Sequence, residues 1–273
     1  MQFLAGLSDD IKKNLLEELR VLWTHMSTSI EGNTLSLGET AFVLSEGLTI
    51  KGKPLKDHRD VEGHARAVDL IMGLLDKEHY TDQDLFDLHR LVISEQVLDV
   101  LKPVGDWKKE NNSTPVTIDG LQAIIEFSNF WDVPSLMGGW LDLLDTEIKA
   151  SKKGPDDVMR SYARLHLSFV SIHPFYDGNG RVARLVSNLP CLKAGFPPVI
   201  IEKEKRFEYI SAIARYQFKN GVPAPTTALI HEDAAFDEFL AFCRQGREKA
   251  LDLVEQAHQL QRTRDGHISG APR

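Results

Sequence analysis

Residues 173–184 read His-Pro-Phe-Tyr-Asp-Gly-Asn-Gly-Arg-Val-Ala-Arg, and this stretch decides the fold. Before it, residues 158–172 carry apolar side chains at helical spacing. Pro174 and the glycine-rich run then end that helix. Helical spacing resumes at Arg181. We therefore predict a loop between two helices that leads directly into the N-terminus of the second.

This loop has the features of a phosphate-binding turn. The first turn of a helix has unpaired N–H groups and a partial positive charge. Gly178 and Gly180 have no Cβ, so a phosphate can approach the backbone closely. Arg181 and Arg184 are three residues apart and share one helix face, where two guanidinium groups can bind separate phosphates. For a Gly-rich turn alone, a tight solvated turn between helices is the alternative.

Two further side chains add reactive chemistry to the same stretch. Asp177 supplies a carboxylate, and Mg²⁺ prefers one or two carboxylates together with phosphate oxygens. His173 has an ordinary pKa near neutrality, so it can take a proton from a hydroxyl. The stretch therefore predicts a base, a metal ligand, an anion cradle and two cationic groups.

These residues resemble the signature of Fic-domain proteins, His-Pro-Phe-x-Asp/Glu-Gly-Asn-Gly-Arg-x-x-Arg, at every specified position. The resemblance implies an all-α Fic fold, with a multi-helix core and one β-hairpin called the flap. It also implies transfer of AMP from ATP, the substrate, to a Ser, Thr or Tyr hydroxyl of a target protein. His173 would deprotonate that hydroxyl and Asp177 would hold Mg²⁺. The phosphates would be bound by Gly178, Asn179, Gly180, Arg181 and Arg184.

A second informative stretch, residues 27–33, lies at the expected end of the first long helix. Taken alone, Glu31 is an exposed carboxylate that is mildly unfavourable near the helix C-terminus. Beside the first motif, the stretch resembles the Fic inhibitory motif Ser/Thr-x-x-x-Glu-Gly/Asn, with Ser27, Glu31 and Gly32 at the matching positions. The resemblance implies that Glu31 binds Arg184 in place of a γ-phosphate and restrains AMP transfer.

One β-hairpin is predicted near residues 104–118, because strand-like residues flank the turn-rich segment 111–115. A surface hairpin without function is the alternative. The resemblance makes it the flap, which binds a target segment by strand addition. The expected docking residues are Trp107, Lys108, Val116 and Ile118. Many relatives have an aromatic–Arg pair where this chain has Trp107-Lys108, and lysine cannot make the bidentate contacts of arginine.

The rest of the chain is predicted to be mainly helical, in three segments. Residues 1–35 form an N-terminal helix with the inhibitory motif, residues 36–220 the Fic core, and residues 221–273 a helical extension and tail. Residues 121–131 are expected to be helical, as are about 25 residues from Asp233, with a frayed end from Thr263. Tyr209 could border the adenine ring, and core packing is the alternative.

Composition narrows the function classes. The formal net charge of −8 argues against a general nucleic-acid binder. No apolar run approaches the roughly 18 residues of a membrane helix, and no signal peptide is recognised. Cys191 and Cys243 lie in apolar helical stretches, so we expect buried thiols in a reducing compartment and a cytoplasmic location.

Two other functions fit the same residues. One is the reverse hydrolysis, removal of AMP from a modified protein, with Glu31 as the base for water. The other is nucleotide sensing without turnover. The sequence leaves open the target protein, the base of the nucleotide and the oligomeric state, although a homodimer could set how firmly Glu31 is held.

Overall fold

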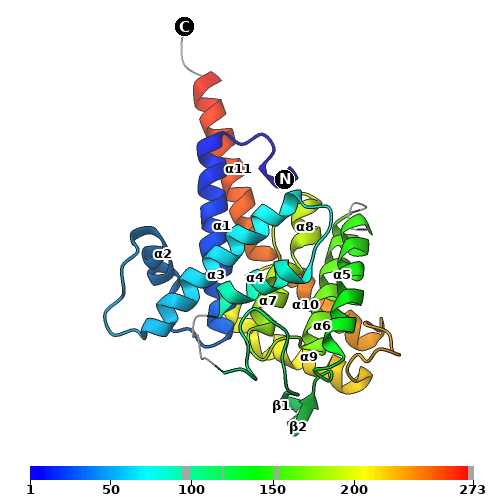
Figure 1. The fold of residues 1–273 in the computed structure, drawn as a ribbon. Coiled ribbons are helices and arrows are strands. Elements are labelled where there is room, and N and C mark those ends of the chain that lie inside the picture. The colour runs from blue at the N-terminus through cyan, green and yellow to red at the C-terminus, as the bar shows by residue number, and fades with distance from the viewer. Residues whose placement is uncertain (94–98, 119, 151–153, 270–273) are drawn as a thin grey trace.

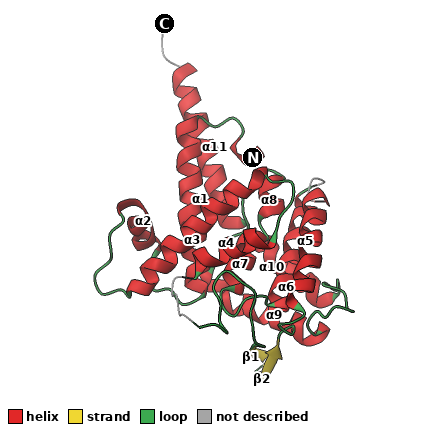
Figure 2. Ribbon diagram, viewed as in Figure 1, coloured by secondary structure: helices red, strands yellow, loops and turns green. Residues whose placement is uncertain are grey.

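The computed structural model describes residues 1–93, 99–118, 120–150 and 154–269. It shows a bundle of helices from which one small β-hairpin projects (Figures 1 and 2), which confirms the predicted all-α class with a single hairpin. The helices are α1 (Asp9–Ile30), α2 (Leu37–Glu46), α3 (Leu55–Gly73), α4 (Asp82–Val92), α5 (Val133–Ala150), α6 (Pro155–Ile172), α7 (Asn179–Val186), α8 (Leu189–Lys193), α9 (Arg206–Asn220), α10 (Ala234–Gln245) and α11 (Glu248–Ser269). The strands are β1 (Ser113–Ile118) and β2 (Leu121–Glu126).

Helix α6 is the centre of the fold. It packs against α5, α7, α8 and α10, and its residues are buried on nearly every side from Val158 to its end. Trp140 of α5 packs edge-on against Phe169 and donates its indole N–H to the Leu165 carbonyl at 3.1 Å. Because α6 is buried along its length and ends at the motif loop, it fixes where that loop lies.

The C-terminal part of the chain differs from the prediction of one long helix. Two helices form there, with Gly246 between them. The Asp233 carboxylate caps α10 by accepting the N–H groups of Ala235 and Phe236. The Gly246 carbonyl accepts the Ile200 N–H at 2.9 Å, so the break packs against the core.

Helix α11 lies alongside α1 (Figure 1) and remains helical to Ser269, so the expected fraying from Thr263 was wrong for the described residues. Its contacts with the start of α1 explain the difference. Gln261 accepts the Ser8 N–H at 2.8 Å, and Arg264 pairs with Asp10 at 2.8 Å. The main core joins residues from all three predicted segments, and both cysteines are buried as predicted.

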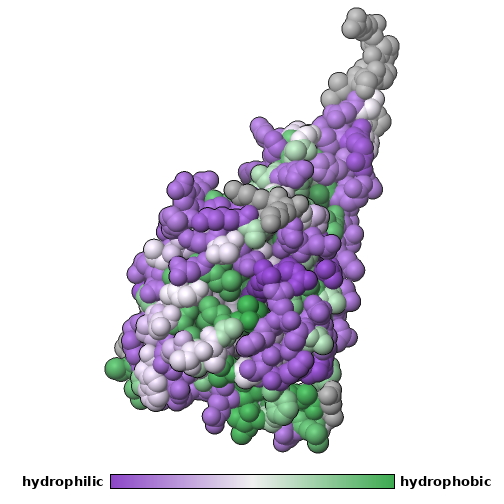
Figure 3. Space-filling view, turned by 90° about the vertical axis from the view of Figure 1, so that its right-hand side faces the viewer, coloured by the Kyte–Doolittle hydropathy of each residue, from purple (hydrophilic) through white to green (hydrophobic). Residues whose placement is uncertain are grey.

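The hairpin starts later than predicted. β1 and β2 pair antiparallel with Val116 opposite Ala123, so the expected helix over residues 121–131 was wrong. The alternating side chains of β2 place Ile125 against α9 and leave Ile124 exposed. This burial on one face favours a strand over the local helical propensity. Leu121 and Ile124 are 74% and 70% exposed, and hydrophobic surface appears at that lower end of the molecule in Figure 3.

Asn188, at the start of α8, connects α7 to the extended segment around Val199. Its amide donates to the carbonyls of Arg184 (2.9 Å) and Val199 (3.0 Å) and accepts the Val199 N–H at 2.7 Å. Asn188→Ala leaves these buried groups unpaired, so we expect a loss of about 2–4 kcal/mol in the free energy of unfolding. Urea unfolding measures this, with the exposed Gln122→Ala as control. If Asn188→Ala were as stable as Gln122→Ala, the stabilising role of the Asn188 hydrogen bonds would be contradicted.

No helix in the described ranges combines the length and the apolar character that crossing a bilayer requires.

Candidate active site

The motif loop joins α6 to α7, as predicted. His173 is the C-cap of α6 and has left-handed backbone angles, φ 55° and ψ 60°. This conformation is unfavourable for a residue with a Cβ, so the surrounding contacts must stabilise it. The His173 N–H donates to the Phe169 carbonyl at 2.9 Å. The turn ends α6 abruptly and leaves the imidazole lining a cleft of about 600 Å³.

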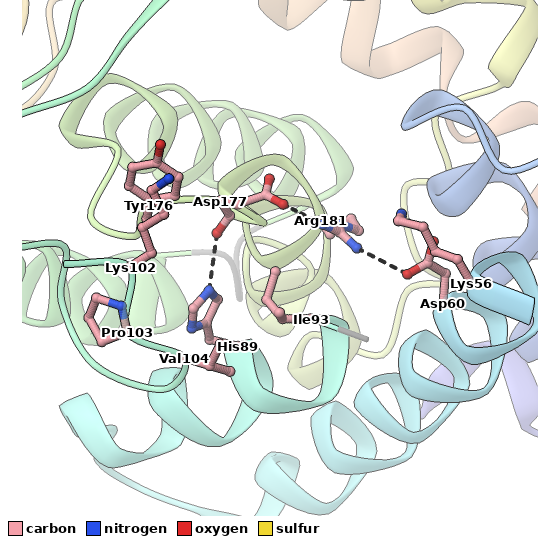
Figure 4. A pocket seen from close by; sticks show the side chains of 10 residues that line it. All are labelled: Lys56, Asp60, His89, Ile93, Lys102, Pro103, Val104, Tyr176, Asp177 and Arg181. Carbon is pink, nitrogen blue, oxygen red and sulfur yellow. Dashed lines mark hydrogen bonds and ion pairs between the residues drawn. The ribbon is translucent and has the colours of Figure 1, made fainter. Parts of the chain in front are cut away.

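Asn179 and His89 stabilise this loop from inside. The Asn179 side chain accepts the Phe175 N–H at 2.9 Å and donates to the Phe175 carbonyl at 2.8 Å. The buried Phe175 ring stacks on His89 with centroids 3.9 Å apart. His89 accepts the Gly105 N–H and donates from Nε2 to the Asp177 carbonyl at 3.1 Å (Figure 4).

His89 is therefore a packing residue that also supports the motif loop. The sequence gives no local signal for this role, because the partners lie far apart in the chain. Burial lowers the pKa of His89 to about 4, so its ring stays neutral near pH 7 and keeps one acceptor and one donor nitrogen.

His173 has the geometry of a proton acceptor. Its Nδ1–H donates to the Val170 carbonyl at 3.2 Å, which leaves the Nε2 lone pair available. The ring stacks on Phe127 with centroids 3.6 Å apart and planes 7° apart. Burial, assisted by the nearby charge of Lys108, lowers the pKa of His173 to about 3, so the imidazole is neutral near pH 7.

The two motif glycines leave room that another residue would fill. Gly178 has φ 79°, and a Cβ there would lie 2.9 Å from Ile93. A Cβ at Gly180 would lie 3.1 Å from both the Arg184 guanidinium and the Glu31 carboxylate. Both glycines line the same cleft as His173, at the N-terminus of α7. The first-turn N–H groups of α7 therefore have the geometry to bind an anion in this cleft.

The two motif arginines have separate partners. Arg181 donates to the Val92 carbonyl at 2.7 Å and lies 3.8 Å from Asp60 and 3.5 Å from Asp177 (Figure 4). It lines a smaller cavity of about 170 Å³, which shares Asp177 with the main cleft. Arg184 is buried as well, but it lines the main cleft and faces α1.

Glu31 and Ser27 meet Arg184 at the end of α1. The Glu31 carboxylate accepts from Arg184 Nη2 at 2.6 Å, while Ser27 accepts twice from the same guanidinium, through Oγ and its carbonyl, each at 3.0 Å. Partial exclusion of water disfavours the charged carboxylate, but Arg184 and Arg181 outweigh this and lower the pKa of Glu31. The Glu31 side chain remains 41% exposed to the cleft. Gly32, with φ 96°, ends the helix immediately afterwards.

The Fic/DOC family matches residues 79–191, which include the whole motif. This chain contains a Fic domain. Curated relatives named protein adenylyltransferase fic-1 are 30% identical over 234 residues in Caenorhabditis briggsae and 29% over 246 residues in Caenorhabditis elegans. These matches cover 84% and 88% of this chain and 43% and 45% of the relatives. The chain thus spans less than half the length of these relatives.

Solved structures agree with the Fic fold. A Fic domain containing signaling protein from Bacteroides thetaiotaomicron has a TM-score of 0.78 at 23% identity, over 95% of this chain and 93% of that one. Fic-1 from Caenorhabditis elegans has a TM-score of 0.70 at 26% identity, over 96% of this chain and 69% of that one. The family match spans neither α1 nor α9, and the structure brings Glu31 and Tyr209 from these helices to Arg184 of the Fic motif.

Tyr209 lies on α9 and contacts Arg184 of the Fic motif. Its hydroxyl accepts from Arg184 Nη1 at 3.3 Å and donates to His166 Nε2 at 2.9 Å. The ring is buried, with the Arg184 guanidinium 5.7 Å from its centre. An adenine contact for Tyr209 stays a prediction, while the observed contact holds Arg184. No sequence pattern indicated that His166, which bonds to the Tyr209 hydroxyl, belongs to this group of contacts.

Trp107 and Lys108 do not lie on the hairpin of the Fic domain, and both are buried. Trp107 packs against Phe86 with ring centroids 4.5 Å apart, and the Lys108 N–H donates to the Pro174 carbonyl at 2.9 Å. The reason is the late start of β1, which leaves residues 104–110 beneath the Fic motif. The side chains of Trp107 and Lys108 are therefore enclosed by the protein.

Val116 and Ile118, the other two expected docking residues, lie on β1 and are partly buried against the α9 side. Within the described residues β1 pairs only with β2, so its other edge is open. Docking of a target by strand addition at that edge stays a prediction.

Asp177 is the expected metal ligand of the Fic motif. Its side chain is 76% exposed, and Oδ1 accepts the Gly178 N–H at 2.6 Å. Across the part of the chain that the structure describes, no three His, Cys, Asp or Glu side chains gather to hold a metal. A single exposed carboxylate beside an anion cradle fits Mg²⁺ bound together with a nucleotide, because Mg²⁺ takes phosphate oxygens and waters as its other ligands.

Proposed function

We propose that this chain transfers AMP from ATP to a Ser, Thr or Tyr hydroxyl of a target protein, and that Glu31 restrains the reaction. The observation that carries the proposal is one cleft in which a neutral imidazole, His173, lies beside a glycine cradle and the Arg184 guanidinium. The names of the relatives, protein adenylyltransferases, support the same reaction.

In this reaction the target hydroxyl gives its proton to Nε2 of His173 while its oxygen attacks the α-phosphorus of ATP. The bond between the α-phosphorus and the bridging oxygen breaks, and pyrophosphate leaves. The N–H groups at the start of α7 stabilise the phosphate charge. Arg184 binds the γ-phosphate. Mg²⁺, held by Asp177, would neutralise part of the phosphate charge when bound.

Glu31 restrains transfer by competing for Arg184. The carboxylate already uses Nη2 of the guanidinium at 2.6 Å, so a γ-phosphate must displace it to bind there. ATP that binds without this contact holds its α-phosphate in an unproductive position. Both negative groups seek the same donor, so the ion pair and the productive nucleotide exclude each other.

The target presents its hydroxyl from a segment added to the open edge of β1. Pro115 lies within β1, and proline is tolerated in a strand whose edge is not paired. Exposed Leu121 and Ile124 on β2 give the hairpin an apolar surface for the same partner. A homodimer and a cytoplasmic location stay predictions from the sequence.

The experiment incubates the Glu31→Gly chain with Mg²⁺ and ATP labelled on either the α- or the γ-phosphate. We expect the α-label on protein, the γ-label in released pyrophosphate, and equal amounts of both. Label on protein from neither position would overturn the proposal for ATP. A wild-type chain that instead removes AMP from a modified protein, and loses this activity in Glu31→Gly, would show the hydrolytic function.

A further inference from the structure

Lys108 is a lysine buried beneath the motif loop. Its side chain is 1% exposed, and Nζ donates to Asn112 Oδ1 at 2.8 Å and lies 5.9 Å from the centre of the Phe127 ring. Among the described residues no carboxylate forms an ion pair with it. A buried ammonium without a counter-ion disfavours folding, so a role beyond packing is indicated.

Asn112 connects the Lys108 ammonium to the motif loop. Its Nδ2 donates to the carbonyls of Phe175 (3.2 Å) and Tyr176 (3.3 Å), both in the motif loop. The Asn112 backbone carbonyl accepts the Phe127 N–H at 3.1 Å. Asn112 precedes β1 and Phe127 follows β2, so this one residue joins both ends of the hairpin to the loop. Phe127 also carries the His173 ring stacked upon it.

We infer that Lys108 is a positioning residue for the transfer reaction, acting through Asn112. An ammonium can only donate, so it holds the Asn112 oxygen toward itself and the Asn112 NH₂ toward the loop carbonyls. That orientation keeps the base of the hairpin against the motif loop and places a segment bound along β1 at the His173 imidazole. The inference rests on the proposed function and concerns the same site.

Loss of the proton from Lys108 removes this constraint, because a neutral amine can also accept a hydrogen bond and allows the amide to turn. Burial lowers the pKa of Lys108 to about 8. The titratable groups of the site with shifted pKa values are His173 at the end of α6, which is close enough to respond to the Lys108 charge, His89 on α4 and Glu31 at the end of α1. The first two have pKa values lowered to about 3 and about 4, and the pKa of Glu31 is also lowered. Their charges therefore stay constant above neutral pH.

The test measures the rate at which the Glu31→Gly chain transfers AMP to serine or threonine side chains of protein, from pH 7 to pH 9. With Lys108 present, the rate should fall about tenfold as the ammonium loses its proton. Lys108→Arg, whose guanidinium stays charged, should keep its rate at pH 9. Lys108→Met and Asn112→Ala should both transfer at least about tenfold more slowly at pH 7, with unchanged affinity for a non-hydrolysable ATP analogue.

The matched control is Lys109→Arg. Lys109 is half-exposed and pairs with Asp106, so this variant should keep the tenfold fall at high pH. An equal fall in Lys108→Arg, or transfer by Lys108→Met at the parental rate, would overturn the inference and leave the proposed function intact. Absence of transfer from the Glu31→Gly parent at every pH would overturn both.

Discussion

Replacing Glu31 with glycine should raise the initial rate of AMP transfer by about 10- to 100-fold, because the charge-assisted bond to Arg184 contributes about 1.5–3 kcal/mol. The two contacts with Ser27 and the contact with the Tyr209 hydroxyl remain in this variant. Arg184 therefore stays in place while the Nη2 hydrogen that Glu31 accepted becomes available for the γ-phosphate. Incorporation of α-label from ATP into protein measures the gain.

A charge-only variant separates electrostatic from steric restraint. Glu31→Gln keeps the size of the side chain and loses the charge, so we expect an intermediate rate. Glu18→Gln, an exposed glutamate on the same helix, is the matched control and should behave as wild type. Because the pKa of Glu31 is lowered, the carboxylate stays charged at neutral pH, and the wild-type restraint should not change between about pH 6 and pH 8. A Glu31→Gly rate equal to wild type would refute the restraint.

Replacing His173 with alanine in the Glu31→Gly chain should lower the transfer rate by about 10²–10⁴-fold, since general-base catalysis contributes that much. His173 is the group in the cleft with an available neutral acceptor nitrogen, whereas the phosphate contacts come from α7. Nucleotide affinity should therefore change little. Rate and affinity are measured separately, by label incorporation and by equilibrium titration with a non-hydrolysable analogue.

The surface histidine variant His79→Ala is the control, because that ring is 74% exposed and pairs with Asp145. It should transfer at the parental rate. If His173→Ala transferred AMP at nearly the parental rate, proton transfer at this position would not be part of the reaction, and another base would be required.

The motif loop could be predicted because its determinants are local. Pro174 ends one helix, Gly178 begins the next with a left-handed backbone, and Asn179 bonds to Phe175 only four residues away. The hairpin could not be placed the same way. Residues 121–126 have no decisive local preference, and the burial of Ile125 against α9 makes them a strand.

The contacts of the candidate site depend on distant pairs. Ser27 and Arg184 are separated by 157 positions, and their meeting was anticipated through a family resemblance rather than through spacing. No resemblance or pattern indicated that Tyr209 and His166 support Arg184. Trp107 and Lys108 were expected on the hairpin surface, but residues 104–110 run beneath the motif loop. Only the packed chain determines which side of that segment faces solvent.

The pairing of α1 with α11 has a mechanical consequence. α1 is about 33 Å long at 1.5 Å per residue, and Glu31 lies at one end of it. α11 holds the opposite end, through Gln261 and Arg264. A stiff helix held at one end limits the movement of its other end. Under the proposed function, the contacts of α11 with the start of α1 would therefore limit how far Glu31 moves away from Arg184. Weakening a contact between α11 and the start of α1, some 30 Å from the cleft, would then change the rate of AMP transfer without altering any group that lines the cleft.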